Sequence, residues 1–254
     1  PNIAEVYRPG HADFTFDAKY GFRDYRGGGR SSGRETIGRV AAGAIAEKVL
    51  GSLGIQVQAR AIKIGPYAAE DREAVEAYLN EKMSQMDSAG GIVECRVTGM
   101  PAGIGDPVFE KLDANLAKAV MGIGAVKGVE IGDGFAVAES CGSRNNDPFR
   151  ADEQGRIYKK SNHAGGILGG ISDGSEIILR AAFKPTASIA QIQETVNRQG
   201  ENVEIQVKGR HDPVIVNRAV VVVESMVALT ILDSLLLNMG ATMQGVEKFY
   251  GNTR

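Results

Sequence analysis

Residues 8–36 read R-P-G-H-A-D-F-T-F-D-A-K-Y-G-F-R-D-Y-R-G-G-G-R-S-S-G-R-E-T, and the rest of the chain is organised around this stretch. It contains five arginines, one histidine and three consecutive glycines, and it leads into a helical pattern. Ser32-Gly33-Arg34-Glu35 fits the S-x-x-E capping box, in which a serine hydroxyl binds backbone N–H groups of the first helical turn. A helix is therefore predicted to begin at Gly33, with Ser32 as its N-cap.

A glycine-rich loop that ends at a helix N-terminus is suited to bind an anion. Its backbone N–H groups and the positive end of the helix dipole both favour negative charge. Arg26, Arg30 and Arg34 would add the forked cationic donors that suit phosphate. The alternative is a solvated basic turn, which an isolated R-G-G-G-R would favour. Because the cap, the glycines and the arginines agree, we interpret the stretch as an anion site.

Composition limits the classes of protein that this chain can belong to. Its 254 residues can bury a substantial core, and the net charge of −2 gives no global attraction to nucleic acid or to an anionic membrane. Cys95 and Cys141 form neither a disulfide framework nor a C-x-x-C metal motif, and no signal peptide is evident. We therefore expect a cytoplasmic protein in a reducing compartment, with local anion binding and no nucleic-acid or membrane partner.

Helical and strand patterns alternate irregularly along the chain. Helices are predicted at residues 37–53, 69–85, 108–121 and 217–239, and strands at 55–64, 91–99, 125–131, 135–139, 175–184 and 203–208. The two strands at 125–131 and 135–139 are expected to form a hairpin around Gly132-Asp133-Gly134. The order lacks the regular βαβ alternation of a doubly wound fold. We predict an α+β fold with antiparallel sheets packed on helices, and a single domain over residues 1–254.

Two of the predicted helices have informative apolar patterns. The helix at 37–53 carries Ile37, Ile45 and Val49 on its predicted buried face, and the alanines and glycines beside them imply close packing against another element. The helix at 217–239 is long and apolar enough to consider a membrane span. Glu224 and Asp233 argue against that, because a carboxylate is costly in lipid. We predict a helix buried in the protein core.

Each of the three histidines lies in a compact polar motif: G-H-A-D at His11, N-H-A-G at His163 and R-H-D-P at His211. Histidine is the natural proton carrier near neutral pH. No pair of histidines has the H-x-x-x-H or H-E-x-x-H spacing of a metal site, so no metal is expected. The three motifs are therefore candidates for acid–base chemistry.

Other clusters suggest an anionic ligand without naming the reaction. Lys184-Pro185-Thr186-Ala187-Ser188 follows a predicted strand and would suit a phosphate or a flavin edge, although such a pentapeptide can be an ordinary turn. Arg210 and Arg218 add a cationic cluster before the last helix. Burial of Asp233 would raise its pKa and suit it to proton transfer, and an ion pair in the core is an equal alternative. No dinucleotide fingerprint or P-loop occurs. These residues indicate a multiply anionic, phosphorylated small molecule.

These motifs, in this order, resemble those of chorismate synthases. The similar segments are R-P-G-H-A-D-F-T with the stretch that follows it to Thr36, A-V-K-G-V-E-I-G-D-G-F, S-N-H-A-G-G-I-L-G-G-I-S-D-G, K-P-T-A-S and G-R-H-D-P. The resemblance implies a carbon–oxygen lyase that converts 5-enolpyruvylshikimate 3-phosphate to chorismate and phosphate by an anti-1,4-elimination. It further implies reduced FMN as cofactor, no net redox change, and a homotetramer in which helices are sandwiched between antiparallel β-sheets.

The resemblance assigns roles to residues by position. His11 matches a histidine beside the reduced flavin, and Asp233 matches an aspartate that works with the flavin in removing a proton. Arg34 and Arg218 are expected to contact substrate. The positions that match flavin-binding residues are Arg30, Ser31, Ser32, Gly124, Ala125, Gly169, Lys184, Pro185, Thr186, Ala187, Ser188 and Arg210.

The largest departure from the family pattern is a missing motif. The family's G-E-S-H-G motif does not occur in this sequence, so the chain is expected to be incomplete at its N-terminus. A truncated or degenerate module that binds FMN or another anion without catalysis is the alternative function. The family is also associated with NADP, but no nicotinamide-binding fingerprint is evident, so reduced flavin is expected to come from an external source.

Overall fold

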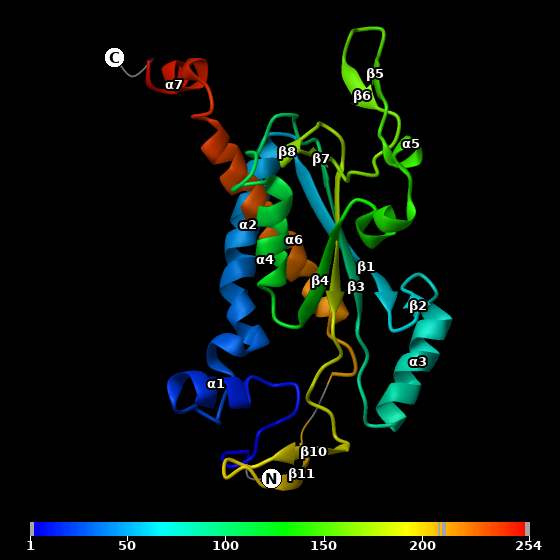
Figure 1. Ribbon diagram of the computed structural model, residues 1–254, viewed down its shortest axis with the longest axis vertical. Helices are drawn as coiled ribbons and strands as arrows, with labels where there is room; N and C mark the ends of the chain where they lie inside the picture. The colour runs from blue at the N-terminus through cyan, green and yellow to red at the C-terminus, as the bar shows by residue number, and fades with distance from the viewer. Residues whose placement is uncertain (1–2, 208, 210–211, 252–254) are drawn as a thin grey trace.

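The centre of the molecule is a five-stranded antiparallel sheet with the strand order β2-β1-β3-β9-β4. The computed structural model describes residues 3–207, 209 and 212–251. The strands are β1 (Gln56–Ile64), β2 (Tyr67–Ala68), β3 (Gly91–Thr98), β4 (Val126–Ile131) and β9 (Ile177–Phe183) (Figure 1). The combination of this sheet with packed helices confirms the predicted α+β class.

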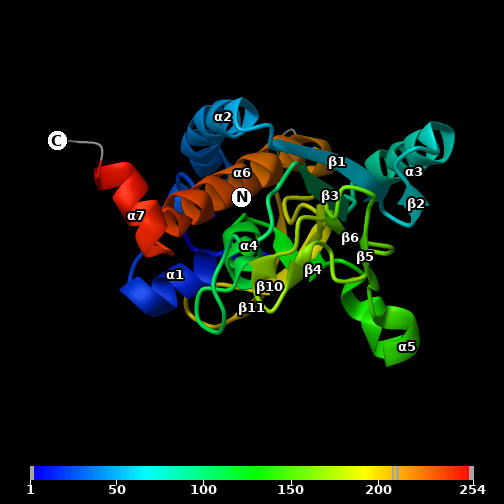
Figure 2. The same cartoon turned by 90° about the horizontal axis from the view of Figure 1, so that it is seen from above.

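Three helices pack together against one face of the sheet: α2 (Thr36–Ser52), α4 (Leu112–Met121) and α6 (Val216–Asn238) (Figure 2). Alternation along β3 explains the core, because Val93, Cys95 and Val97 are completely buried among the helix side chains. Glu94 lies on the opposite face, where Arg96 and Arg180 bind its carboxylate at 2.8 and 3.0 Å. One face of the sheet is thus apolar, and the other is covered by ion pairs.

Smaller elements surround this core. They are α1 (Asp13–Tyr20), α3 (Arg72–Ser84), α5 (Gly142–Asn145), α7 (Met243–Tyr250), the hairpins β5 (Phe149–Ala151) with β6 (Ile157–Lys159) and β10 (Ile192–Val196) with β11 (Asn202–Gln206), and the pair β7 (Ile167–Leu168) with β8 (Ile171–Ser172). The β10–β11 hairpin and α1 lie at one end of the molecule, and α7 and the β7–β8 pair lie at the other (Figure 1).

The predicted hairpin at 125–139 is wrong. Its first strand forms as β4, but β4 pairs with β9, and residues Gly134–Glu139 form a 3-10 helix instead of a second strand. The Glu130 carboxylate accepts a hydrogen bond from the Phe135 backbone at 3.2 Å and stabilises this turn. A partner distant in sequence thus replaces the local partner that the Gly-Asp-Gly turn suggested.

Helix α2 packs very closely on α6. A Cβ atom at Gly43 would lie 2.3 Å from Cβ of Ser225, so only glycine fits there without displacing a neighbour. This confirms the close packing predicted from the alanines and glycines. The predicted face is wrong, because Ile37 and Ile45 are 78% and 67% exposed, while Gly43, Ala46 and Leu50 are buried. Gly43 and Ala46, together with Leu50, form the buried face in place of Ile37 and Ile45.

Helix α6 is long and apolar enough to span a membrane by length and composition alone. In this fold it packs against α2, α4 and the sheet, with Val223, Val227 and Ile231 completely buried. Its Glu224 accepts a hydrogen bond from the Ala59 backbone N–H of β1 at 2.6 Å. That N–H belongs to the part of β1 that β2 does not pair with, so the carboxylate covers an otherwise open strand edge.

A buried ion cluster anchors the polar segment at residues 143–160. The Lys159 ammonium lies 2.7 Å from Asp173 and 3.1 Å from Asp147, and all three side chains are at most 7% exposed. Burial raises the pKa of Asp147, but hydrogen bonds from the Ala164 and His163 backbones outweigh it and hold the pKa well below its usual range. The cluster thereby fixes β6 to the segment that follows β8.

Candidate active site

The glycine loop enters α2 through a capped 3-10 turn. The Ser32 hydroxyl accepts a hydrogen bond from the Arg34 backbone N–H at 3.3 Å, and α2 begins at Thr36. Ser32 is therefore the N-cap of this turn, as predicted. The Glu35 side chain does not complete the capping box by binding the Ser32 backbone. Its carboxylate binds Arg39 at 2.8 Å instead.

Sheet pairing brings two distant segments to one edge of the pocket described below. Val126 at the start of β4 pairs with Phe183 at the end of β9, and the Lys184 N–H donates to the Ala125 carbonyl at 2.9 Å. Residues 124–125 and 184–187 therefore adjoin, although some sixty residues separate them in sequence. Ala125 has φ = +73°, a left-handed conformation that costs free energy for an alanine and is commoner at functional sites.

The loop that carries His11 docks against the segment after β9. The Lys184 ammonium donates to the Gly10 carbonyl at 2.8 Å, and a Cβ at Gly10 would lie 2.8 Å from Cβ of Ala187. The Ser188 Oγ atom lies 3.0 Å from Nε2 of His11. The R-P-G-H-A-D and K-P-T-A-S motifs are thus in direct contact.

An ion pair closes the His11 loop on itself. The Arg8 guanidinium binds the Asp13 carboxylate through two hydrogen bonds of 2.8 Å, and its backbone N–H adds a third at 3.0 Å. Burial raises the pKa of Asp13, but the hydrogen bonds from Arg8 outweigh it and lower the pKa below its usual value. Asp13 therefore stays ionised, and the loop keeps one shape.

These segments enclose a pocket of about 610 Å³, which we call the loop pocket. The predicted site residues that line it are His11, Ser31, Ser32, Gly124, Ala125, Lys184, Pro185, Thr186 and Ala187. Arg30 and Arg34 are exposed on the two turns that border it, and neither guanidinium forms an ion pair within the described residues. The structure thus gathers most of the predicted site residues, with two available cations at the rim.

Comparison with known protein families identifies the family to which the chain belongs. Residues 1–236 match the family model described as "Chorismate synthase". The chain belongs to the chorismate synthase family. Chorismate synthases are lyases of amino-acid biosynthesis that act on a small-molecule substrate.

Individual relatives agree over almost the whole chain. A chorismate synthase from Lachnospira eligens is 60% identical, over 98% of this chain and 73% of the relative. One from Roseiflexus castenholzii is 50% identical, over 96% of this chain and 73% of the relative. The crystal structure of a chorismate synthase superimposes with a TM-score of 0.75 at 29% identity, covering 95% of this chain and 75% of the other.

Besides Arg30, Arg34 and Ser188, three predicted site residues in the described part of the chain do not line the loop pocket: Gly169, Arg218 and Asp233. Gly169 lies in the β7–β8 turn, and Asp233 is exposed near the C-terminal end of α6. Because α6 has 23 residues, it spans about 35 Å, and the pocket residue Ile215 immediately precedes its other end. Arg218 binds Asp212 at 2.7 Å and does not line the pocket. Arg210 lies outside the described residues.

Asp233 is also less buried than the sequence suggested. The interpretation of a carboxylate inside the core is wrong for this chain, because the side chain faces away from the buried stripe of α6. The apolar residues around Asp233 in the sequence suggested burial, but α6 is apolar on more faces than the one it buries. Asp212, by contrast, closely precedes Ile215 at the pocket end of α6. Asp212 belongs to the G-R-H-D-P motif, and this motif was the feature of the sequence that could have pointed to it.

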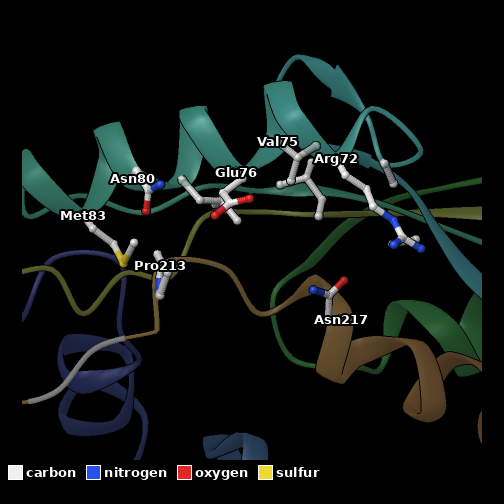
Figure 3. A pocket seen from close by; sticks show the side chains of 11 residues that line it. Arg72, Val75, Glu76, Asn80, Met83, Pro213 and Asn217 are labelled. Carbon is white, nitrogen blue, oxygen red and sulfur yellow. The ribbon is translucent and has the colours of Figure 1, made fainter.

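A second groove, of about 510 Å³, lies between α3 and the segment that leads into α6. Arg72, Glu76 and Asn80 of α3 point toward Pro213 and Asn217 across it (Figure 3). None of the predicted site residues that the structure describes lines this groove. We therefore place the candidate active site in the loop pocket.

Proposed function

We propose that this chain is a chorismate synthase that removes phosphate and a C6 proton from 5-enolpyruvylshikimate 3-phosphate by an anti-1,4-elimination. The carrying observation is the loop pocket, in which a histidine, a glycine loop at a helix entrance and the K-P-T-A segment meet. Family membership supports the same reaction. The proposal makes the chain a carbon–oxygen lyase acting on phosphates.

We propose reduced FMN as the cofactor, and the pocket residues fit such a group. The Thr186 Oγ atom is buried and has no hydrogen-bond partner within the described chain, although it lies in the pocket lining. A Cβ at Gly27 or Gly33 would meet no protein atom within 4 Å, so these pocket glycines leave space that the protein does not fill. When bound, reduced FMN would supply electron density to the substrate ring as phosphate leaves.

The chain's own residues would bind, orient and carry protons. Arg30 and Arg34 are suited to hold the substrate phosphate and carboxylates, because their guanidinium groups border the pocket without carboxylate partners in the described residues. Lys184 adds a further cation in the lining. His11 would hold or transfer a proton at its imidazole. The preorganised loops would exclude water and keep these groups in place.

The carboxylate that accepts the substrate proton can be tested by comparing two aspartates. We expect Asp212→Asn to lower kcat by about 10²-fold or more, the size of a general-base contribution, and Asp233→Asn to lower it by less than about threefold. The reason is position, because Asp212 lies at the pocket end of α6 and Asp233 near the opposite end. Steady-state assays of both variants give the answer. A larger loss for Asp233→Asn would favour the role predicted from the family resemblance.

The cofactor and the reaction are tested together by a flavin titration and a chorismate assay. We expect the flavin absorbance of FMN to change on addition of the protein, to change further with substrate, and chorismate to form only with reduced FMN. Binding without turnover would support the alternative of a non-catalytic FMN or anion module. No perturbation of the flavin spectrum, with or without substrate, would refute the proposal.

We propose that the protein is a cytoplasmic homotetramer that receives reduced flavin from an external source, with NADP entering only through that source. Both cysteines are free, which suits a reducing compartment. Large apolar side chains are exposed on the outer surfaces of α6 and α7, among them Leu237 at 68%, Met243 at 69% and Phe249 at 56%. Exposed apolar surface of this kind is typical of subunit interfaces. Light scattering would measure the mass of the assembly.

A further inference from the structure

The contact between Ser188 and His11 suggests a role for the serine that differs from cofactor binding. Oγ of Ser188 lies 3.0 Å from Nε2 of His11, across 177 positions of sequence. His11 lines the loop pocket, as do the four residues that precede Ser188, but Ser188 itself does not. The hydroxyl therefore contacts the imidazole from a residue outside the pocket lining.

Other contacts already hold the backbone of the His11 loop. The Arg8–Asp13 pair closes the loop, and the Lys184 ammonium binds the Gly10 carbonyl at 2.8 Å. Neither contact involves the imidazole ring. What Ser188 adds is a hydrogen bond to one ring nitrogen, which selects the orientation of the ring and limits its tautomers.

The chemistry of the partner matters, because a hydroxyl can donate or accept. A serine hydroxyl can donate to Nε2 of a neutral imidazole and can accept from Nε2–H of a protonated one. A carboxylate can only accept. The same chain shows that second arrangement at His163, whose Nδ1 atom lies 2.6 Å from Oδ2 of Asp133, outside the loop pocket. The histidine in the pocket thus has, at Nε2, a partner that can either donate or accept.

We propose that Ser188 is a positioning residue whose hydroxyl orients the imidazole of His11 through Nε2 and keeps this contact when the ring gains or loses a proton. The proposal rests on the proposed function, in which His11 carries a proton in the pocket. The hydroxyl acts on the reaction only through His11. The Ser188 hydroxyl is therefore assigned to the orientation of the histidine.

The first test is spectroscopic and needs neither flavin nor substrate. In protein labelled with ¹⁵N-histidine, a long-range ¹H–¹⁵N spectrum reports which ring nitrogens are protonated or hydrogen-bonded, and the His11→Asn variant assigns the His11 signals. We expect Ser188→Ala to shift the Nε2 signal of His11 and Ser188→Thr to leave it close to wild type. The His163 signals should stay unchanged in both variants and provide an internal control.

Ser88→Ala is the matched control. The Ser88 hydroxyl donates to the Thr186 carbonyl at 2.7 Å, so it supports the same segment without contacting the imidazole. We expect this variant to leave the His11 signals in place. An unchanged His11 spectrum in Ser188→Ala, or the same change in Ser88→Ala, would overturn the proposal. Ser188→Cys, which is close to serine in size and a weaker hydrogen-bonding group, replaces Ser188→Ala if the latter does not fold.

The second test is kinetic. We expect Ser188→Ala to lower kcat by about tenfold, the loss of one hydrogen bond, with little change in KM, and Ser188→Thr to restore most of the rate. Equal losses in the alanine and threonine variants would contradict a role for the hydroxyl. If the wild-type protein forms no chorismate while the spectroscopic result holds, the proposed function fails and the positioning contact stands.

Discussion

Replacing His11 with asparagine is expected to lower kcat for chorismate formation by about 10²- to 10⁴-fold, the range of general acid–base catalysis. The imidazole lines the loop pocket and touches Ser188, and asparagine keeps a polar side chain without a group that titrates near neutral pH. The Arg8–Asp13 pair and the Lys184–Gly10 hydrogen bond do not depend on the ring, so the loop should keep its shape. Flavin binding should therefore change much less than turnover.

The same substitution at His163 is the matched control. His163 lies in a similar polar motif, but its ring binds Asp133 outside the loop pocket. We expect His163→Asn to cause a much smaller loss of kcat. Steady-state kinetics and a flavin titration of both variants distinguish the cases. A His11→Asn variant that retains more than about a third of the wild-type kcat would show that another group carries the proton.

The second large effect concerns the crossing of α2 and α6. Gly43→Ala is expected to lower the free energy of unfolding by about 1–3 kcal/mol, as overpacking of a core does. The added methyl group would lie 2.3 Å from Cβ and 2.7 Å from Cα of Ser225, so the helices would have to separate. Leu50, Val223 and Val227 pack in the same core and would lose contact as a result. Urea unfolding measures the loss.

Gly38→Ala is the matched control on the same helix. Nothing lies within 4 Å of a Cβ at this position, and residue 38 is exposed. Alanine at an exposed helical position should raise the free energy of unfolding by about 0.5–1 kcal/mol relative to glycine. The same chemical change is thus expected to have opposite signs at two positions of α2. Destabilisation of similar size at both would show that the helix crossing is not the cause.

A double substitution isolates the contact itself. Combining Gly43→Ala with Ser225→Gly removes the side-chain atoms nearest to the new methyl group. We expect the pair to lose less than the sum of the two single changes, because the sites share one contact. Additive losses would place the strain on the Ser225 backbone instead of its side chain.

Local sequence signals predicted the elements correctly where a helix or strand depends only on residues close together in the sequence. Ser32 is the cap of the turn that leads into α2, and the helix at 217–239 forms as α6 within one residue at each end. The strands at 55–64, 91–99 and 175–184 form as β1, β3 and β9. Capping and side-chain periodicity are properties of neighbouring residues, so the sequence contains them directly.

The predictions were wrong where the local sequence allowed two structures equally well. Residues on two sides of α2 are apolar or small, and periodicity gives the repeat of a helix without saying which side meets a neighbour. The face with Gly43 and Ala46 is buried because it lets α6 approach closely, which leaves Ile37 and Ile45 exposed in the described chain. In the same way, β4 pairs with β9 and not with the segment after the Gly132 turn.

The sequence by itself determined the chemical parts of this protein: the arginine and glycine stretch at 8–36, the K-P-T-A-S segment and the motifs that mark the family. Only the tertiary structure decided which parts meet. The antiparallel register of β4 and β9 brings Ala125 to Lys184, and docking of the His11 loop brings Ser188 to the imidazole. It also left Asp233 exposed near the end of α6 opposite the loop pocket. Contacts between segments distant in sequence depend on register and packing, which no local pattern encodes.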